Sequence, residues 1–333
     1  MNNIESARNT IWISWETHRR TNELAKAFGA NLYIYNCNPS TNILIRYLRS
    51  SYFTVKTIYN IKPKILFVQN PSLVLASLAC FLKNIFKYKL VVDRHTNFWL
   101  GAGNSIDPIF LIFKFFSNYS LKNAEFTIVT NEYLKDIVNK SNGRGFVLTD
   151  RLPDIVSKNR KKLSGRLNIV FISTFSKDEP FREVFNAAKL IDEDIFIYVT
   201  GNYKKIFHEI PRDMPPNLIL TGFLEEQDFI DLLFSADGIM DFTTADWTLV
   251  CGGYEAISAG KPFITSEKEV LRTYFTKGAI FTENNASGIS NAIMYLDKNR
   301  DVYQAEIDQI RNEKSVEWKM QFNDLLDLIG IDR

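Results

Sequence analysis

Short apolar runs rich in β-branched and aromatic residues recur along the whole chain, and helix-like stretches separate them. In the first half these runs span residues 11–15, 30–36, 64–69, 89–93, 125–130 and 145–149. In the second half they span residues 167–173, 195–201, 217–223, 238–244, 262–266 and 279–283. Because strands that alternate with helices form parallel sheets with helices on both faces, the pattern predicts an α/β fold of two Rossmann-like, doubly wound domains.

The stretch SKNRKKLSGR at 157–166 is charged, carries Ser and Gly, and is nearly free of apolar residues. This composition predicts an exposed linker between an N-terminal domain at 1–156 and a C-terminal domain at 167–314. The chain from 301 to 329 is helical in pattern, so residues 315–333 are expected to form a C-terminal helix. Two doubly wound domains in tandem are expected to place the carboxyl ends of their strands around a shared cleft, where ligands of open α/β sheets bind.

The composition narrows the class of protein further. No apolar stretch approaches the roughly 20 residues that a membrane-spanning helix needs, and the polar start MNNIESARNT lacks the apolar core of a secretory signal. The three cysteines, Cys37, Cys80 and Cys251, are widely spaced without a CxxC pair, which favours neither a disulfide framework nor a zinc site. We therefore expect a cytoplasmic protein with free thiols.

The formal net charge of +2 hides a strong asymmetry between the two halves. Residues 1–160 contain 21 Lys and Arg against 10 Asp and Glu, a balance of +11, whereas residues 161–333 contain 19 against 28, a balance of −9. Such a split indicates that the first half faces an anionic partner, for which nucleic acid, lipid headgroups and a phosphorylated substrate are candidates. A merely solvated basic face is the alternative.

The densest motif of the second half is TLVCGGYEAISAGKP, residues 248–262. The pair Gly252 and Gly253 would let a ligand approach the backbone closely, at the start of a helix whose free N–H groups favour phosphate. Glu255 follows within one turn and could accept hydrogen bonds from sugar hydroxyls. The alternative is that the two glycines serve close helix packing.

Three further strand ends in this half carry polar or glycine residues. Ser173, Thr174 and Lys177 offer hydroxyls, backbone amides and a cation suited to a diphosphate. Gly201, Gly222 and Phe223 follow the next two strands, where a plain turn is the alternative reading. Neither GxxxxGK[ST] nor an opening GxGxxG occurs, which argues against kinases, ATPases and nicotinamide enzymes.

In the first half, His18, Arg19 and Arg20 follow the first predicted strand and stand at the start of a helix. Arginines gain nothing from the dipole at a helix start, so a phosphate or other acceptor group in the cleft would explain them. Asp93 ends the predicted strand at 89–93 and His95 follows two residues later, at a place where a general base would be wanted. A capped loop is the alternative for each of them.

Taken together, STFSKDEPF, VTGNYKK, TGFLEEQDFIDLLFSADG and EAISAGKPFITSEKEVLRTYFTKGAIF resemble the donor domain of GT-B glycosyltransferases of group 1 (GT4-like). With VQNPS, DRHTNFW and VLTDRLPD in the first half, the chain is similar to the ALG-type β-1,4-mannosyltransferases of lipid-linked oligosaccharide synthesis. The likeness extends over almost the whole chain. It implies a GT-B fold, with the acceptor in the first domain and the nucleotide-sugar donor in the second.

The resemblance also implies roles for single residues. Glu255 matches the glutamate that binds the nucleotide ribose, and Gly222 with Phe223 matches the place where the base is held. The segments from Thr248 to Gly253 and from Thr174 to Lys177 match the loops that meet the diphosphate, and Arg19 with Arg20 matches the basic residues after the first strand. Packing of the C-terminal helix against the first domain is usual in the resembled type.

One departure from the family pattern concerns the pair of glutamates written E-x7-E. Counting back eight positions from Glu255 leads to Trp247, with Asp246 next to it. The acidic group expected near the donor sugar is therefore missing or shifted by one. Inverting transfer needs a base that deprotonates the acceptor hydroxyl, and Asp93 or His95 could serve.

We therefore expect a glycosyltransferase of the hexosyltransferase type that moves a sugar from a UDP- or GDP-linked donor to a glycan or lipid-linked acceptor, in surface polysaccharide or lipid-linked oligosaccharide synthesis. No metal and no other cofactor are expected, and nucleic acid is not expected as a partner. The basic aromatic stretches LIRYLRSSYF, CFLKNIFKYK and PIFLIFKFFSNYS suit peripheral contact with anionic lipid on the inner membrane face, or a buried face with lysines reaching outward. A nucleotide-sugar epimerase and a non-catalytic GT-B scaffold or partner subunit are the alternatives.

Overall fold

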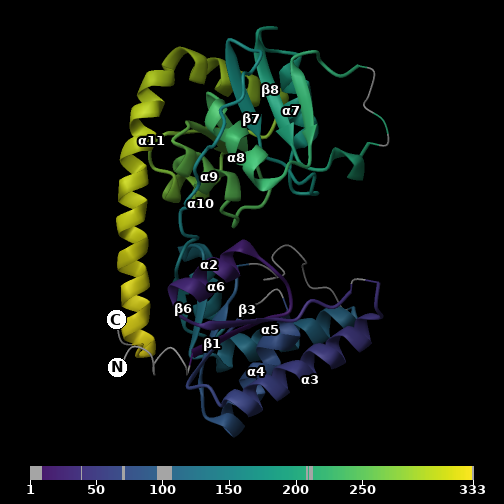
Figure 1. Ribbon diagram of the computed structural model, residues 1–333, viewed down its shortest axis with the longest axis vertical. Helices are drawn as coiled ribbons and strands as arrows, with labels where there is room; N and C mark the ends of the chain where they lie inside the picture. The colour runs from purple at the N-terminus through teal and green to yellow at the C-terminus, as the bar shows by residue number, and fades with distance from the viewer. Residues whose placement is uncertain are drawn as a thin grey trace. The chain divides into compact units, whose positions relative to one another are not determined.

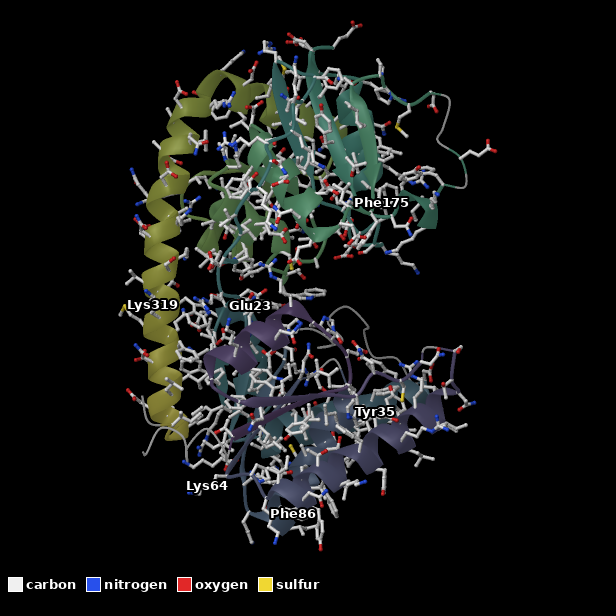
Figure 2. The ribbon with its side chains drawn as sticks, in the orientation of Figure 1. Glu23, Tyr35, Lys64, Phe86, Phe175 and Lys319 are labelled. Atoms are coloured by element: carbon white, nitrogen blue, oxygen red, sulfur yellow. The ribbon has the colours of Figure 1, made fainter. Side chains whose placement is uncertain are left out.

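A computed structural model describes residues 10–38, 40–69, 72–95, 107–207, 209 and 213–331 of the 333-residue chain. The chain forms two compact units. Unit 1 holds the chain up to Asp150 and again from Trp318, and unit 2 holds Arg151–Glu317. Side chains fill the interior of each unit (Figure 2).

Unit 1 is built on a six-stranded sheet in which all neighbouring strands are parallel, in the order β2-β1-β3-β4-β5-β6. The strands are β1 (Thr10–Ser14), β2 (Asn31–Ile34), β3 (Ile65–Gln69), β4 (Lys89–Asp93), β5 (Phe126–Val129) and β6 (Gly145–Val147). The connecting helices are α2 (Arg19–Ala27), α3 (Ile43–Ile61), α4 (Leu73–Phe86), α5 (Pro108–Asn123) and α6 (Glu132–Lys140). Helix α4 packs on β3 and β4 and contacts both α3 and α5 (Figure 1).

Both faces of this sheet are buried, which explains the continuous apolar runs of its strands. In β1, Ile11 and Ile13 pack into the core on the side of α4. Trp12 points to the opposite face, where its ring stacks on Phe67 at a centroid distance of 4.9 Å. Successive side chains of one buried strand therefore supply two separate cores.

Unit 2 repeats this design with six parallel strands in the order β12-β11-β10-β7-β8-β9. The strands are β7 (Leu167–Phe171), β8 (Ile195–Thr200), β9 (Leu218–Gly222), β10 (Gly238–Asp241), β11 (Phe263–Ser266) and β12 (Ala279–Thr282). The helices are α7 (Phe181–Ala188), the 3-10 helix η1 (Tyr203–Lys205), α8 (Glu226–Ser235), α9 (Cys251–Ala259) and α10 (Glu269–Tyr274). Counted within the unit, this is the Rossmann strand order 3-2-1-4-5-6 read from the other edge.

A long helical segment, α11 (Ala286–Ile329), ends the described chain and is interrupted at Asn299, whose backbone is not helical. Its last part belongs to unit 1, where Trp318, Leu325 and Ile329 join the core that contains Trp12. The Trp318 Nε1–H also donates a hydrogen bond of 3.1 Å to the Thr149 carbonyl. The apolar face that the sequence shows between 318 and 329 is thus buried against the first sheet.

The predicted fold class is confirmed, since each apolar run forms a strand and both sheets are parallel.

The first part of the predicted linker, residues 157–161, is hydrogen-bonded to the rest of unit 2. Asp231 Oδ1 accepts hydrogen bonds from the Ser157 hydroxyl and from the backbone amides of Lys158 and Asn159, at 2.8, 2.7 and 3.1 Å. The two units divide earlier along the chain, between Asp150 and Arg151.

Candidate functional site

In unit 1 the strand order reverses between β1 and β3, which is where a ligand is expected to bind in an open α/β sheet. The predicted residues of this unit are found there and at the end of the neighbouring strand β4. Arg20, in the first turn of α2, forms a buried ion pair with Asp93 at the end of β4. The Nε and Nη2 groups of Arg20 donate to Asp93 Oδ1 at 3.0 and 2.9 Å.

Arg20 donates hydrogen bonds to two further residues inside the protein. Its Nη2 donates to the Leu148 carbonyl at 2.9 Å, and its Nη1 donates to the carboxylate of Asp150. Arg20 therefore ties α2, β4 and the segment after β6 together. The expectation that Arg20 makes acceptor or phosphate contacts is not supported by this geometry, because its side chain is buried and bound to Asp93, Asp150 and the Leu148 carbonyl.

Asp93 carries a fixed negative charge. Its burial opposes ionisation, but the interactions with Arg20 and His95 together outweigh this effect and lower the pKa of Asp93 to about 2. A buried carboxylate with so low a pKa is a poor proton acceptor near neutral pH. The prediction that Asp93 could act as the base is therefore not supported by this geometry.

His95 lies beside this ion pair and is more accessible. Its Nδ1 is 3.7 Å from Asp93 Oδ2, an electrostatic contact that is too long for a hydrogen bond. The rings of His95 and His18 meet edge to face at a centroid distance of 6.4 Å. Of the two candidates for the base, His95 is the more accessible, and the Asp93 carboxylate lies near its ring without a hydrogen bond that would fix the orientation of the ring.

The other basic residues after β1 point outward. His18 Nε2 is 3.1 Å from Glu16 Oε2, and the exposed Arg19 lies 4.0 Å from Glu23 one turn along α2. The side chains of His18 and Arg19 are thus partly exposed to solvent, whereas that of Arg20 is buried. Residues 96–99 of the motif DRHTNFW lie outside the described residues.

In unit 2 the strand order reverses between β7 and β10, which places the expected ligand-binding point at the loops that follow these two strands. The loop after β7 is organised by Glu179. Its carboxylate accepts hydrogen bonds from the Ser173 hydroxyl at 2.6 Å, the Thr174 hydroxyl at 2.6 Å and the backbone amides of Thr174 and Phe175 at 2.9 Å.

This arrangement differs from the predicted role of the loop in binding a diphosphate. The hydroxyls and amides that were expected to meet a diphosphate are satisfied by the protein's own carboxylate, which also holds Phe175 at a φ of 58°. Phe175 is buried in the core of unit 2 (Figure 2). Lys177 is exposed and forms no ion pair with another described residue, so its ammonium is open to an anion.

Gly252 and Gly253 serve packing. A Cβ on Gly252 would lie 2.6 Å from the Cβ of Asp241, and one on Gly253 would lie 2.2 Å from the ring of Phe275. The Gly252 amide donates to Asp241 Oδ2 at 2.8 Å, and the Gly253 amide donates to the Val250 carbonyl at 3.3 Å. The prediction that these glycines and amides receive a phosphate is therefore not supported, and their geometry is that of the packing alternative.

Asp241 caps helix α9 from the neighbouring strand β10, and sequence reasoning missed it. Its burial, together with the nearby charges of Glu179, Glu255 and Asp178, raises its pKa well above the ordinary value. Four carboxyl groups therefore lie close together where the strand order reverses between β7 and β10. The available signal was an apolar strand, GIMD, that ends in a carboxylate.

The remaining predicted residues lie at the same edge. Glu255 is half-buried on α9, and Thr248 is half-buried in the loop before that helix. Gly201 follows β8 with a φ of 94°, and a Cβ there would lie 1.9 Å from the Ser173 carbonyl oxygen. Gly222 ends β9 with a φ of 76°, and Phe223 after it is 80% exposed.

Asp246 precedes Trp247, the position at which the family pattern has its first glutamate. The carboxylate of Asp246 is paired with a lysine side chain. Its Oδ1 accepts a hydrogen bond of 2.6 Å from Lys268 Nζ. Among the described residues there is no group of three or more His, Cys, Asp or Glu side chains that could hold a metal ion.

No protein-family model matches this chain, and a comparison with curated proteins finds none that matches. Solved structures do match. HepE of Anabaena, solved with UDP-glucose, has 13% sequence identity and a TM-score of 0.70, and the match covers 95% of this chain and 91% of HepE. Sucrose-phosphate synthase of Thermosynechococcus elongatus has 10% identity and a TM-score of 0.67, with 90% and 82% covered.

A protein of Listeria monocytogenes described as a UDP-N-acetylglucosamine 2-epimerase has 13% identity and a TM-score of 0.58, with 90% of this chain and 82% of that protein covered. At such identities a match establishes the fold. The two parallel six-stranded sheets and the near-complete coverage show that this chain has the two-domain α/β fold of GT-B proteins.

Proposed function

We propose that this protein is a glycosyltransferase that uses a nucleotide-diphosphate sugar and holds this donor at the strand ends of unit 2. The GT-B fold supports the proposal, because HepE has this fold and was solved with UDP-glucose. The observation that carries it is Phe223, an 80% exposed ring at the end of β9 beside Gly222. An aromatic side chain that the fold leaves bare at the ligand edge of a Rossmann-like sheet suits stacking on a base.

The other residues of this edge receive matching roles. Glu255 would accept hydrogen bonds from ribose hydroxyls, and Lys177 and Thr248 would contact the diphosphate. The backbone amides of these loops already donate hydrogen bonds to Glu179 and Asp241. The exposed Lys177 would therefore stabilise the charge of the leaving group in their place. We propose hexosyl transfer from a UDP- or GDP-linked sugar without a metal ion, by an enzyme of the group 1 (GT4-like) type.

Donor binding is testable by calorimetric titration with UDP, GDP, CDP and dTDP. We expect one nucleotide to bind, and we expect Phe223→Ala to weaken this binding by about 1–3 kcal/mol because the base loses its stacking partner. Phe81→Ala, which removes an exposed ring from α4 in unit 1, is the matched control and should leave the affinity unchanged. If folded protein binds none of the four nucleotides, the non-catalytic scaffold becomes the better account.

We further propose that unit 1 receives the acceptor, a glycan or a lipid-linked glycan, with His95 as the base that deprotonates its hydroxyl. Asp93 behind the imidazole would stabilise the protonated form, and Arg20 would keep Asp93 in place. His18 and Arg19, which are accessible, would contact the acceptor.

The surface of unit 1 supports peripheral contact with an anionic membrane. Helices α3, α4 and α5 expose large apolar side chains and contain no Asp or Glu. The exposed apolar residues are Ile43, Leu44, Ile45, Leu48, Tyr52 and Tyr59 on α3, Phe81 and Ile85 on α4, and Leu111, Ile112 and Phe115 on α5. Because α4 contacts both neighbours, these side chains lie on adjacent helices.

Exposed cations accompany these residues, among them Arg49, Lys56 and Lys114. Such a face can insert its apolar side chains among lipid headgroups while each cation near anionic lipid contributes about 1 kcal/mol. No helix in the described chain is long and apolar enough to cross a bilayer. The contact we propose is therefore interfacial.

Membrane binding is testable by co-sedimentation with vesicles of phosphatidylcholine and phosphatidylglycerol. The protein should sediment with the mixed vesicles at low salt and much less at high salt or with phosphatidylcholine alone. The double variant Leu48→Glu, Phe115→Glu should lose binding, whereas Val302→Glu, at an exposed position of α11, should keep it. Equal sedimentation of the two variants would exclude this face as the contact.

A further inference from the structure

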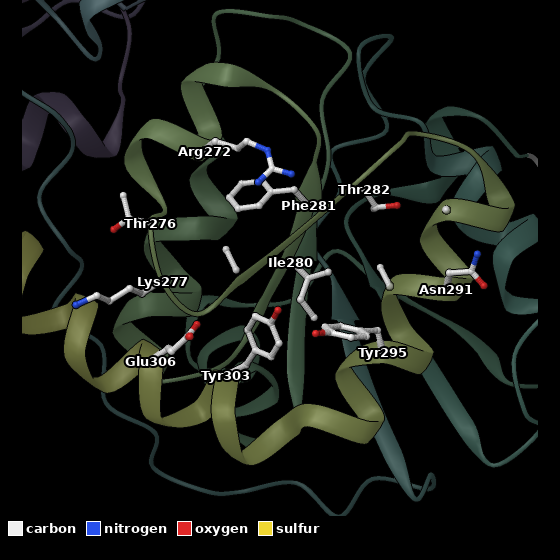
Figure 3. Close-up of a pocket in the computed structure, with 13 residues that line it drawn as sticks. Arg272, Thr276, Lys277, Ile280, Phe281, Thr282, Asn291, Tyr295, Tyr303 and Glu306 are labelled. Carbon is white, nitrogen blue, oxygen red and sulfur yellow. The ribbon is translucent and has the colours of Figure 1, made fainter.

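Unit 2 has a groove along β12, the outermost strand on one side of its sheet (Figure 3). The groove encloses a volume of about 700 Å³. Its lining includes Arg272, Phe281, Asn291, Tyr295, Tyr303 and Glu306, contributed by α10, β12 and α11. None of the residues that line the groove is among the proposed donor residues, which lie after β7, β8, β9 and β10.

The backbone of β12 offers hydrogen-bonding groups to this groove. The carbonyls of Gly278 and Thr282 accept hydrogen bonds of 2.9 and 2.8 Å from the amides of Phe263 and Glu267, on and just beyond β11. Because alternate residues of a strand bond to opposite sides, the peptide groups of Ala279 and Phe281 face away from β11. Both residues line the groove.

The two cations that line the groove, Arg272 and Lys277, are ion-paired within the protein. Arg272 is ion-paired with Glu267 and lies over the Phe281 ring, 4.5 Å from its centroid. Lys277 Nζ is 2.6 Å from Glu313 Oε1, and Glu306 Oε2 accepts a hydrogen bond of 2.8 Å from the Gly278 amide. An anionic ligand would therefore find no unpaired cation at Arg272 or Lys277, which argues against an anion as the ligand of this groove.

Aromatic rings and polar groups lie together in this groove, with Tyr303 beside Tyr295 (Figure 3). Tyr295 is 51% exposed and meets Tyr303 edge to face at a centroid distance of 6.1 Å. Asn291 lies exposed on the next turn of α11 toward its start. Rings with an apolar face and a hydroxyl at the tip, combined with an amide, a carboxylate and free peptide groups, match a ligand with apolar C–H faces and many hydroxyls.

We propose that the β12 groove is a second carbohydrate site that binds a neutral glycan chain. Sugar rings would pack on Tyr295 and Phe281, and their hydroxyls would bond to Asn291, Glu306 and the outward peptide groups of β12. This inference goes beyond the proposed transfer reaction and does not depend on the donor site, because its residues and its ligand are different.

The test is a glycan array that carries neutral oligosaccharides of glucose, mannose, galactose and N-acetylglucosamine, and then titration of the strongest of them. We expect binding of at least one neutral glycan and at least a tenfold loss of affinity in Tyr295→Ala. Tyr133→Ala, which removes an exposed ring from α6 in unit 1, is the matched control and should bind as the unchanged protein does.

Glu255→Ala separates this inference from the proposed function, since it should weaken nucleotide binding and leave glycan binding intact. Absence of binding to every neutral glycan, in protein that is folded, would overturn the inference. Glycan binding with an affinity that Tyr295→Ala does not change would also overturn it. The same holds if an extended peptide binds to this groove and no glycan does.

Discussion

Replacing Arg20 with alanine is expected to lower the free energy of unfolding by about 3–5 kcal/mol, the usual cost of removing one partner of a buried ion pair. Asp93 would remain buried without its counter-charge, and the Leu148 carbonyl would lose a donor. Chemical denaturation of both proteins at neutral pH measures the difference. Arg19→Ala is the matched control, because Arg19 is 49% exposed and its contact with Glu23 is worth at most about 0.5 kcal/mol.

The same pair gives this difference a defined pH dependence. The folded-state pKa of Asp93 is about 2, below its ordinary value, so its contribution is complete above about pH 4 and is lost as the pH falls toward 2. Without Arg20, burial would raise the pKa of Asp93 and favour the protonated form. The destabilisation by Arg20→Ala should therefore shrink in acid, and a difference that stays constant between pH 7 and pH 3 would contradict this role of the ion pair.

Replacing Gly201 with alanine is expected to have the second large effect, about 2–5 kcal/mol. A φ of 94° is unfavourable for alanine, and the new Cβ would lie 1.9 Å from the Ser173 carbonyl oxygen, so the loop after β7 must move. Because Glu179 holds this loop together through Ser173 and Thr174, nucleotide binding should weaken as well.

Gly222→Ala isolates the backbone contribution to this effect. Gly222 has a φ of 76°, but the atom nearest to its added Cβ is 3.9 Å away, so only about 1–2 kcal/mol is expected. Thermal or chemical unfolding of the two variants provides the comparison. Equal losses of stability would show that the contact with Ser173 is not what requires glycine at 201.

The strands could be predicted because both faces of each sheet are buried. In β1 (Thr10–Ser14) every residue is buried, so Ile11, Trp12 and Ile13 follow one another without a polar residue between them and stand out in the sequence as an apolar run. The positions of Phe223 and Lys177 at strand ends were predictable from the same pattern. Strands and strand ends, which depend on one stretch of chain and its own burial, could thus be predicted from the sequence.

The roles of the glycines and arginines depend on distant residues and could not be predicted. Whether Gly253 faces a ligand or a neighbour is decided by Phe275, and the use of Arg20 is decided by Asp93, which lies on another strand. Likewise, the donors of the loop after β7 look free in the sequence, and only the fold brings Glu179 back onto them.

The most direct test of the donor site is a crystal structure of the protein soaked with the nucleotide that binds in the calorimetric panel. We expect the base against the Phe223 ring, the ribose within hydrogen-bonding distance of Glu255 and the diphosphate near Lys177. A nucleotide bound elsewhere, or a β7/β10 edge that stays closed by Glu179 and Asp241 at saturating nucleotide, would contradict the claim that this edge is the donor site.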